Sequence, residues 1–300
     1  MSPKLLGAML AAVALLAGIV VSAQQPDEAV RGAFLESRPK TTNLNAPSRR
    51  HRRRPSANKN ANANNSSATA MNVNAVNSNA SAHMHGAKKS LPAIGIGYTL
   101  FMRDSDGRGV RVEPTREFRN GDRVRIALET NTDGYLYIFD SEDGAPARMI
   151  YPDVRLDGGE NWIEAHVPME IPSSDESEER LRWFEFYGKP GGDRIYVVLT
   201  REPLASVPIS DELVAFCGLN KDKCPWQPPS DVWARIEKGA KANVKVATTK
   251  NFGQAQTETE KVATTRGLGL DKSAPQPAVI RINASTSEPV LVTVLDLVHK

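Results

Sequence analysis

From residue 94 onward, the chain is a series of short segments in which apolar and polar residues alternate. Residues 123–130 (RVRIALET) place Val124, Ile126 and Leu128 on one face and charged or small side chains on the other. A period of two is typical of an antiparallel strand with one buried face. Turn signals rich in Gly, Asp and Asn recur about every 8–12 residues. The pattern predicts an all-β fold, an antiparallel β-sandwich that is Ig-like in general architecture, with strands near residues 94–102, 110–114, 123–130, 135–140, 161–168, 181–188, 193–203, 278–282 and 289–298.

Two short helices are predicted to interrupt the series of strands. Ser210 is the expected N-cap of the first helix, which Gly218 should end, and Ser230 is the expected N-cap of the second. The stretch from 243 to 276 is polar and repetitive in Thr, Lys and Gln, which indicates a long flexible insertion. We therefore expect one β-sandwich domain over residues 90–300, with a helical and flexible insertion at about 208–276.

The first 23 residues have the pattern of a secretory signal peptide. Lys4 supplies the positive charge, residues 5–21 are apolar or small, and Val21-Ser22-Ala23 is a small-residue cleavage site. Retention of this segment as a marginal membrane anchor is the alternative, because about 20 apolar residues are needed to span a bilayer comfortably. The expectation is export, to the periplasm, the cell envelope or the medium.

Residues 24–89 are predicted to be a disordered arm. Asn58–Ala82 consists almost entirely of Asn, Ala and Ser, which cannot bury enough apolar surface to offset the cost of ordering. Residues 24–88 carry ten Lys/Arg and three Asp/Glu, whereas residues 89–300 carry 27 and 32. A basic arm is thus joined to a mildly acidic body. The cluster formed by Arg49, Arg50, Arg52, Arg53 and Arg54 could bind an anionic surface with no nucleic-acid specificity, or it could be a solvated charge run or a processing point.

The chain has two cysteines, Cys217 and Cys224. In an oxidising compartment an even pair is most simply a disulfide. The loop that they would close is short, so the chain-entropy model gives roughly 2.5 kcal/mol. A metal site needs about four ligands, and no His accompanies the pair.

Acidic residues near glycines are the first candidates for chemistry. Asp104–Gly109 (DSDGRG) and the stretch containing Asp140, Glu142 and Asp143 resemble fragments of calcium loops, but neither continues with the ligands that such a loop needs. Asp and Gly are also the residues that tight turns prefer. A hydrolase could use Asp140 and Asp153 as paired carboxylates in a cleft. We favour turns, with a weak cation site or a carboxylate pair as alternatives.

The aromatic residues are the second candidates, either exposed to stack on sugars or partner side chains, or filling the sandwich core. They are Tyr135, Tyr137, Phe139, Tyr151, Trp183, Phe184, Phe186 and Tyr187. His166 is expected to be a half-exposed structural residue, and His83 and His85 could chelate a metal loosely in the arm. The sequence has no H-E-x-x-H, G-x-S-x-G, Walker A or dinucleotide glycine motif. No catalytic, cofactor-binding or metal-binding residue is assigned.

The order of these segments resembles the family of domain of unknown function 4384 over residues 95–205. The resemblance rests on the stretches FRNGDRVRIALETNTDGYLYIFDSEDGAPARMIYPD and RWFEFYGKPGGDRIYVVLTREPL, with the positions Phe118, Gly121, Asp122, Gly134, Tyr135, Leu136, Tyr137, Gly144, Tyr151, Pro152, Gly191 and Gly192. It implies an accessory or interaction β-domain of exported bacterial proteins, with no catalytic residues to carry over. The basic arm, the cysteine loop and the last two strands lie outside it.

The sequence therefore favours a non-catalytic exported domain that binds a protein or a cell-envelope component, without a cofactor. The alternative is an envelope hydrolase or a carbohydrate-binding domain that uses acidic and aromatic residues. A deep pocket that gathers both residue types would favour the alternative.

Overall fold

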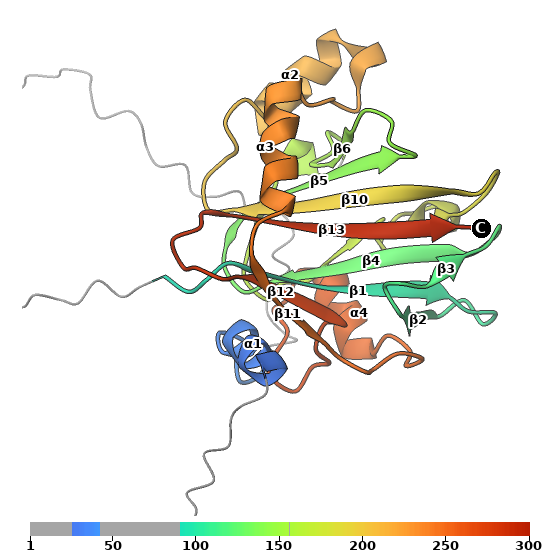
Figure 1. Cartoon of the computed structure of the whole chain (residues 1–300). Helices are drawn as coiled ribbons and strands as arrows, with labels where there is room; N and C mark the ends of the chain where they lie inside the picture. Colours follow the sequence, from blue (N-terminus) through green and yellow to red (C-terminus); the bar gives the residue numbers. More distant parts are fainter. Residues whose placement is uncertain (1–25, 43–90, 156) are drawn as a thin grey trace, which may run out of the picture.

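Two stacked β-sheets form the body of the protein in the computed structural model, which describes residues 26–42, 91–155 and 157–300 (Figure 1). Sheet A has the order β11-β12-β1-β4-β8, with β2 pairing β1 and β9 pairing β4. Its strands are β1 (Gly95–Arg103), β2 (Gly109–Val112), β4 (Arg123–Thr130), β8 (Met169–Ile171), β9 (Phe184–Glu185), β11 (Val244–Thr248) and β12 (Val279–Asn283).

Sheet B has the order β3-β13-β10-β5-β6, with β7 pairing β5. Its strands are β3 (Glu117–Phe118), β5 (Gly134–Glu142), β6 (Arg148–Tyr151), β7 (Trp162–Ile163), β10 (Gly191–Thr200) and β13 (Val290–His299). The pairing of β3 with β13 is parallel, and the other named pairs are antiparallel. The last two predicted strands, β12 and β13, belong to different sheets. The predicted all-β sandwich is confirmed.

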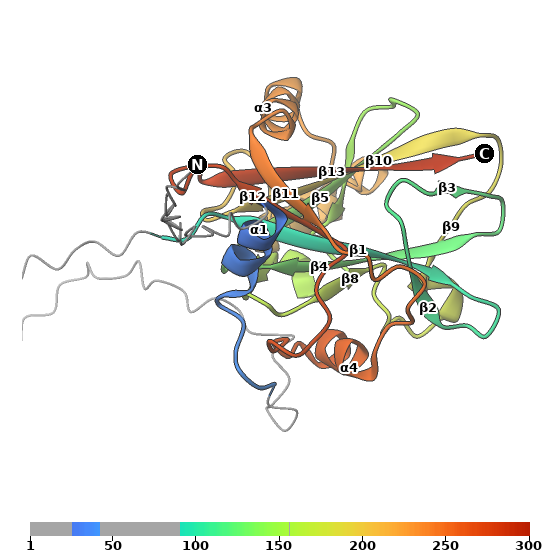
Figure 2. The ribbon, with the colours of Figure 1, turned by 60° about the horizontal axis from the view of Figure 1, so that its bottom comes forward.

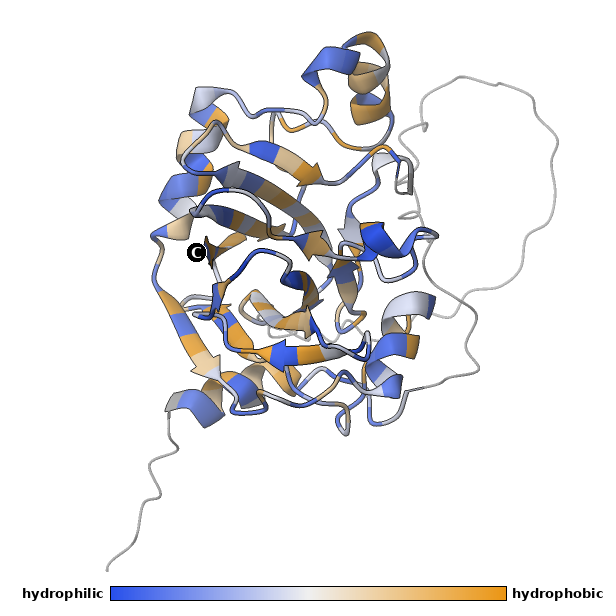
Figure 3. Ribbon diagram, turned by 90° about the vertical axis from the view of Figure 1, so that its right-hand side faces the viewer, coloured by the Kyte–Doolittle hydropathy of each residue, from blue (hydrophilic) through white to orange (hydrophobic). Residues whose placement is uncertain are grey.

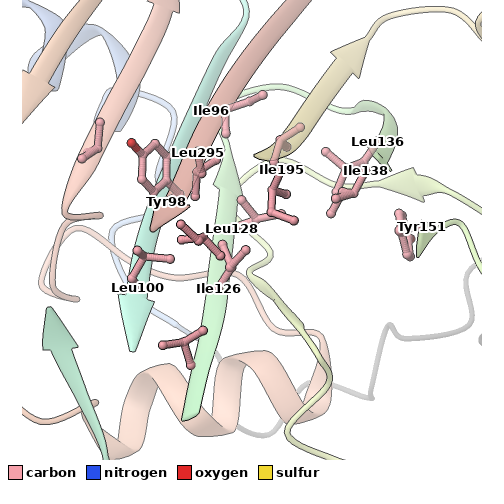
Figure 4. Close-up of a cluster of buried hydrophobic side chains, with 14 of the residues drawn as sticks. Ile96, Tyr98, Leu100, Ile126, Leu128, Leu136, Ile138, Tyr151, Ile195 and Leu295 are labelled. Carbon is pink, nitrogen blue, oxygen red and sulfur yellow. The ribbon is translucent and has the colours of Figure 1, made fainter. Parts of the chain in front are cut away.

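The core between the sheets follows the predicted alternation. Val124, Ile126 and Leu128 of β4 are buried against side chains of sheet B such as Leu136 and Ile138. Figure 4 shows residues of the two sheets pointing toward one another. Burial of each such aliphatic side chain contributes about 1.5–3 kcal/mol, so this layer supplies the main driving force for stacking the sheets.

The aromatic residues of β5 lie on the other face of sheet B. Tyr135, Tyr137 and Phe139 are buried with residues of α2 (Ser210–Leu219) and α3 (Ser230–Ala240). Figure 1 shows α3 crossing the outer face of sheet B. The expectation that aromatic residues fill the sandwich core is confirmed for Tyr151 and Phe186. It is wrong for the three aromatic residues of β5, because both faces of this strand are buried and its aliphatic set faces sheet A.

The two predicted helices are present, but their caps differ from those expected. Neither Ser210 nor Ser230 is an N-cap. The helices begin at these residues, and no side-chain cap hydrogen bond is made at the preceding Ile209 and Pro229. The first helix also continues one residue beyond Gly218. Short 3-10 turns lie at Asp157–Gly159, Glu179–Arg182 and Lys221–Lys223.

The predicted flexible insertion at 243–276 is wrong. Its first part is β11, which pairs with β12, and its second part contains α4 (Glu258–Arg266). Thr257 and Glu260 form a capping box at the start of α4, and Gly267 ends it with a φ of 60°. Arg111 of β2 forms an ion pair with Glu260. The first part therefore extends sheet A, and the part that contains α4 lies against the outer face of the sheet (Figure 2).

The predicted disorder of residues 24–89 is wrong for residues 26–42. Pro26–Leu35 form α1, which packs beside β11 and β12 (Figure 2). Phe34 is fully buried, and Arg38 makes a bidentate contact with Glu129 at 2.6 and 2.8 Å. We call residues 26–42 the N-terminal strap. The predicted signal peptide, residues 43–90 and the arginine cluster lie outside the described residues.

His166 is not a half-exposed strand residue. It is 1% exposed, has a φ of 59°, and lies after the two-residue β7 (Trp162–Ile163). Its Nδ1 is 2.7 Å from Glu129 Oε1 and its Nε2 is 2.7 Å from Ser37 Oγ. The outer face of β4 is thus buried beneath a polar network. Burial of both faces explains why the alternation of β4 does not mark a solvated side.

Within the described residues, no helix has the length and apolar character needed to cross a membrane.

Candidate binding groove

A groove of about 860 Å³ lies where the edges of the two sheets approach one another. One wall contains residues of β6, the edge strand of sheet B, and the opposite wall contains Ile171 of β8, the edge strand of sheet A. The third side is α2 with the segment that follows it. We call this feature the edge groove.

Each of the two edge strands has one side on which its main-chain N–H and C=O groups are not paired with another described strand of the sheet. Within the described residues, β8 pairs only with β4. β6 pairs with β5, and its Met149 N–H donates one further hydrogen bond to the carbonyl of Trp226 at 2.8 Å. Proline follows each edge strand directly, at Pro152 and Pro172, and both prolines line the groove. Proline lacks an N–H donor and is found at the ends and edges of sheets, so these two positions stop the ladders there.

The segment between β8 and β9 lines part of the groove. β8 and β9 pair in turn with the same edge of β4, at 126–128 and at 123–124. The residues between them leave the sheet and line the groove with Glu176, Arg180 and Leu181. Leu181 is 42% exposed, so an apolar side chain faces solvent at the rim.

Two tryptophans give the groove its apolar character. Trp183 and Trp226 line it together with Phe184, and both indoles are largely buried. The guanidinium carbon of Arg125 lies 4.2 Å from the centroid of Trp183. Arg125 is held in turn by Glu170, 3.2 Å away. Burial lowers the pKa of Arg125, and the charge of Glu170 opposes this shift.

The predicted disulfide between Cys217 and Cys224 is present, and both residues line the edge groove. It joins the last turn of α2 to the segment that carries Pro225 and Trp226. The carbonyl of Trp226 accepts the hydrogen bond from Met149 N–H of β6. The disulfide therefore also restrains the segment that pairs with the edge of β6.

Charged residues lie at the rim in pairs of opposite sign. Arg155 donates to both carboxylate oxygens of Asp153, and Arg180 donates to Glu178 at 2.8 Å. Burial alone would raise the pKa of Asp153, but the hydrogen bonds from Arg155 outweigh it and hold that pKa below its usual value. The rim therefore offers both signs of charge around an apolar floor.

The acidic stretch is a turn only at its end, because Asp140 and Glu142 belong to β5 and the turn is at Asp143 and Gly144. Asp143 and Gly144 have φ values of 46° and 76°, and Asp143 accepts a hydrogen bond from Gly192 N–H at 2.8 Å. Asp153 lines the edge groove but Asp140 does not, so the suggested carboxylate pair has no shared cleft among the described residues. Within the same part of the chain, no cluster of three His, Cys, Asp or Glu could hold a metal ion.

An acidic neighbour that the sequence did not single out is Asp193 of β10. It lies directly opposite Glu142 in the ladder, two pairs from the one that contains Asp140. Burial and the charges of Asp140, Glu142 and Asp143 raise the pKa of Asp193 to about 6, and His299 opposes the shift. The cluster is a zone of repulsion at the end of sheet B.

Sequence reasoning missed the edge groove, although one local signal was present. The prolines after β6 and β8, together with RWFEF at 182–186, mark the positions where two ladders stop beside aromatic residues. The contribution of Trp226 had no such signal, because it depends on where the disulfide places the segment after α2. The arginine cluster lies outside the described residues.

Residues 117–203 match the family model described as domain of unknown function (DUF4384), in agreement with the resemblance read from the sequence. The matched region runs from β3 through β10 and includes β6, β8 and β9. The strap, α2 with its disulfide, and β11–β13 lie outside it. No curated protein and no solved structure matches the chain.

Proposed function

We propose that this protein is a non-catalytic, exported interaction domain whose edge groove binds an extended segment of a partner protein. The observation that carries the proposal is an apolar groove bounded by two strand edges from different sheets. An added strand gains affinity from main-chain hydrogen bonds, and adjacent pockets select its alternate side chains.

The chemistry of the walls supports a polypeptide occupant. The β8 edge supplies peptide donors and acceptors that only another backbone satisfies in register. Trp183, Phe184 and Trp226 give apolar surface for side chains, and aromatic anchors carry much of the binding energy in protein interfaces. The paired charges of Asp153 with Arg155 would contact polar residues that flank such a segment.

Export is part of the proposal and is supported by the signal-like N-terminus and by the disulfide. The arginine cluster at 49–54 would add salt-dependent attraction to anionic surfaces. Replacing these five arginines with glutamine in the full chain should abolish salt-sensitive retention on anionic vesicles. Retention that is independent of salt or unchanged by the replacement would remove this part of the proposal.

Site-specific photocrosslinking tests the groove directly. A photoreactive residue at Leu181, on the groove rim, is compared with one at Tyr187, which is 83% exposed but does not line the groove. Full-length protein is irradiated in the native cells, and the captured peptides are sequenced. We expect discrete protein adducts at Leu181 that are absent at Tyr187 and that map to one extended segment.

Equal labelling at the two positions would contradict the proposal, as would adducts at Leu181 that contain only lipid or saccharide. As a control for folding, both labelled proteins should have the melting temperature of the wild type. Loss of the Leu181 adduct on addition of a synthetic peptide with the captured sequence would show that the same groove binds that segment.

A further inference from the structure

A second hollow, of about 940 Å³, lies on the outer face of sheet B beside α3. Figure 1 shows β10 and β13 continuing past α3 toward the C-terminus, and the hollow lies over this uncovered part. We call it the α3 hollow. It shares no lining residue with the edge groove.

The floor of the α3 hollow is a row of polar side chains across three strands. Arg194 lies opposite Asp296 of β13 on one side and opposite Ser141 of β5 on the other. The guanidinium of Arg194 donates to Asp296 at 2.6 Å and also hydrogen-bonds the hydroxyl of Tyr196. Both members of the ion pair are more than half exposed, so their remaining donors and acceptors face the hollow.

One face of α3 forms the wall. Ser230, Trp233 and Glu237 follow a spacing of three and four residues, which places them on the same side of a helix. Trp233 is half-buried, because its ring packs edge-on against Tyr196 and Phe139 with centroids 4.6 and 6.0 Å away. The indole is therefore fixed in place while part of it borders the hollow.

The charge of the α3 hollow argues against an anionic ligand. Its only lining guanidinium, Arg194, is already neutralised by Asp296, and the carboxylate of Glu237 stands on the wall. A phosphate or carboxylate would meet the carboxyl groups of Asp193, Glu237 and Asp296 and no free cation among the lining residues. Hydroxyl groups, in contrast, can donate to the carboxylates and accept from the guanidinium.

We propose that the α3 hollow binds an uncharged oligosaccharide, with Asp296, Arg194 and Glu237 hydrogen-bonding its hydroxyls and Trp233 contacting a sugar ring. An aromatic ring offers a flat apolar surface to the C–H face of a pyranose, and polar groups around it fix the orientation. This inference is independent of the peptide-binding proposal, because the two sites use different residues.

Calorimetric titration of the full-length protein tests it with neutral tetrasaccharides as probes: cellotetraose, maltotetraose and chitotetraose. We expect saturable binding of at least one of them, with a Kd of about 1 mM or tighter. Asp296→Ala and Glu237→Ala, both at exposed positions, should each weaken it about tenfold. Glu185→Ala is the matched control, because it removes a cross-strand ion pair with Arg123 in sheet A, and neither residue lines the hollow. It should leave binding unchanged.

Three results would overturn the proposal. These are the absence of saturable binding for all three probes, an equal effect of the control and the test variants, and saturable binding of tetralysine in place of the sugars. The last result would assign the carboxylates to a cationic peptide. Crosslinking at Leu181 is unaffected by any of these results, so failure of this proposal is distinguishable from failure of the groove proposal.

Discussion

Glycine at two positions of β1 makes room for the ring of Phe34. A Cβ at Gly95 would lie 2.9 Å from Phe34 Cδ2, and one at Gly97 would lie 3.1 Å from Phe34 Cζ and 2.4 Å from Pro277 Cγ. The Gly-Ile-Gly run therefore marks the place where the N-terminal strap and Pro277 pack closely against the sheet. From the sequence alone, the same run looks like a simple strand start, because nothing local indicates what fills the space.

Gly97→Ala is expected to lower the free energy of unfolding by about 2 kcal/mol, since a methyl group there must displace packed rings. Gly192→Ala is the matched control, because its Cβ would approach nothing closer than the Leu297 carbonyl oxygen at 3.8 Å. Urea denaturation of both variants measures the difference. Equal stability of the two would show that Pro277 and Phe34 do not occupy this space.

The pKa of Asp193 gives a second prediction at this scale. Its pKa is raised from 3.8 to about 6 in the folded protein, so the folded state holds the proton more tightly than the unfolded chain. Its contribution to stability is therefore lost as the pH rises from about 4 to about 6, and it stays lost above that.

Asp193→Asn should consequently be more stable than wild type at pH 7.5, by roughly 1 kcal/mol after allowance for solvent screening of this half-buried group. The difference should shrink as the pH falls toward 4. Thermal denaturation at several pH values measures it. A difference that is constant with pH, or that grows in acid, would show that Asp193 is not held in a repulsive cluster.

At the scale of elements, the sequence predicted those whose signals are local. The strand β4, its face toward sheet B and the turn at Asp143 and Gly144 were predicted correctly, whereas the burial of the other face of β4 was not. The capping box of α4, Thr257 to Glu260, was an equally local signal that was missed. α1 could not be found in this way, because ten residues rarely form a stable helix alone. It is stabilised by burial of Phe34 and by the contact of Arg38 with Glu129.

Arg38→Ala should release the N-terminal strap. The side chains of Arg38 and Glu129 are 0% and 4% exposed, and removal of one partner leaves a buried charge without its counterion, at a cost of about 3–5 kcal/mol. We expect faster proteolysis after residue 31 and a lower melting temperature. Arg116→Ala is the control, since its ion pair with Asp122 is exposed and long at 3.8 Å; an equal effect of both variants would contradict a clamping role.

The disulfide gives the second prediction for elements. Replacing Cys217 and Cys224 together with serine removes the constraint on a loop with a sequence separation of 7, which should lower stability by about 2.5 kcal/mol. It should also weaken capture of the partner at Leu181, because Trp226 loses its anchor. Unchanged capture together with lowered stability would show that the disulfide contributes to stability and not to binding of the partner.

At the scale of the whole molecule, two sheets and two outer layers place the edge groove and the α3 hollow on separate surfaces. Composition and periodicity predicted the sandwich, because burial of alternate side chains is a local pattern. They could not predict which face of β5 meets sheet A, since both faces are buried. They also could not predict the edge groove, whose walls come from β6, β8 and the segment after α2, far apart in the sequence.

Hydrogen exchange of the full-length protein, with and without a peptide of the captured sequence, tests the central claim most directly. If the segment adds to the sheet edge, amides of β8 should exchange at least tenfold more slowly in the complex, whereas those of β11, the edge strand at the far end of sheet A, should not change. Protection elsewhere, with β8 unaltered, would contradict binding of an extended segment in the edge groove.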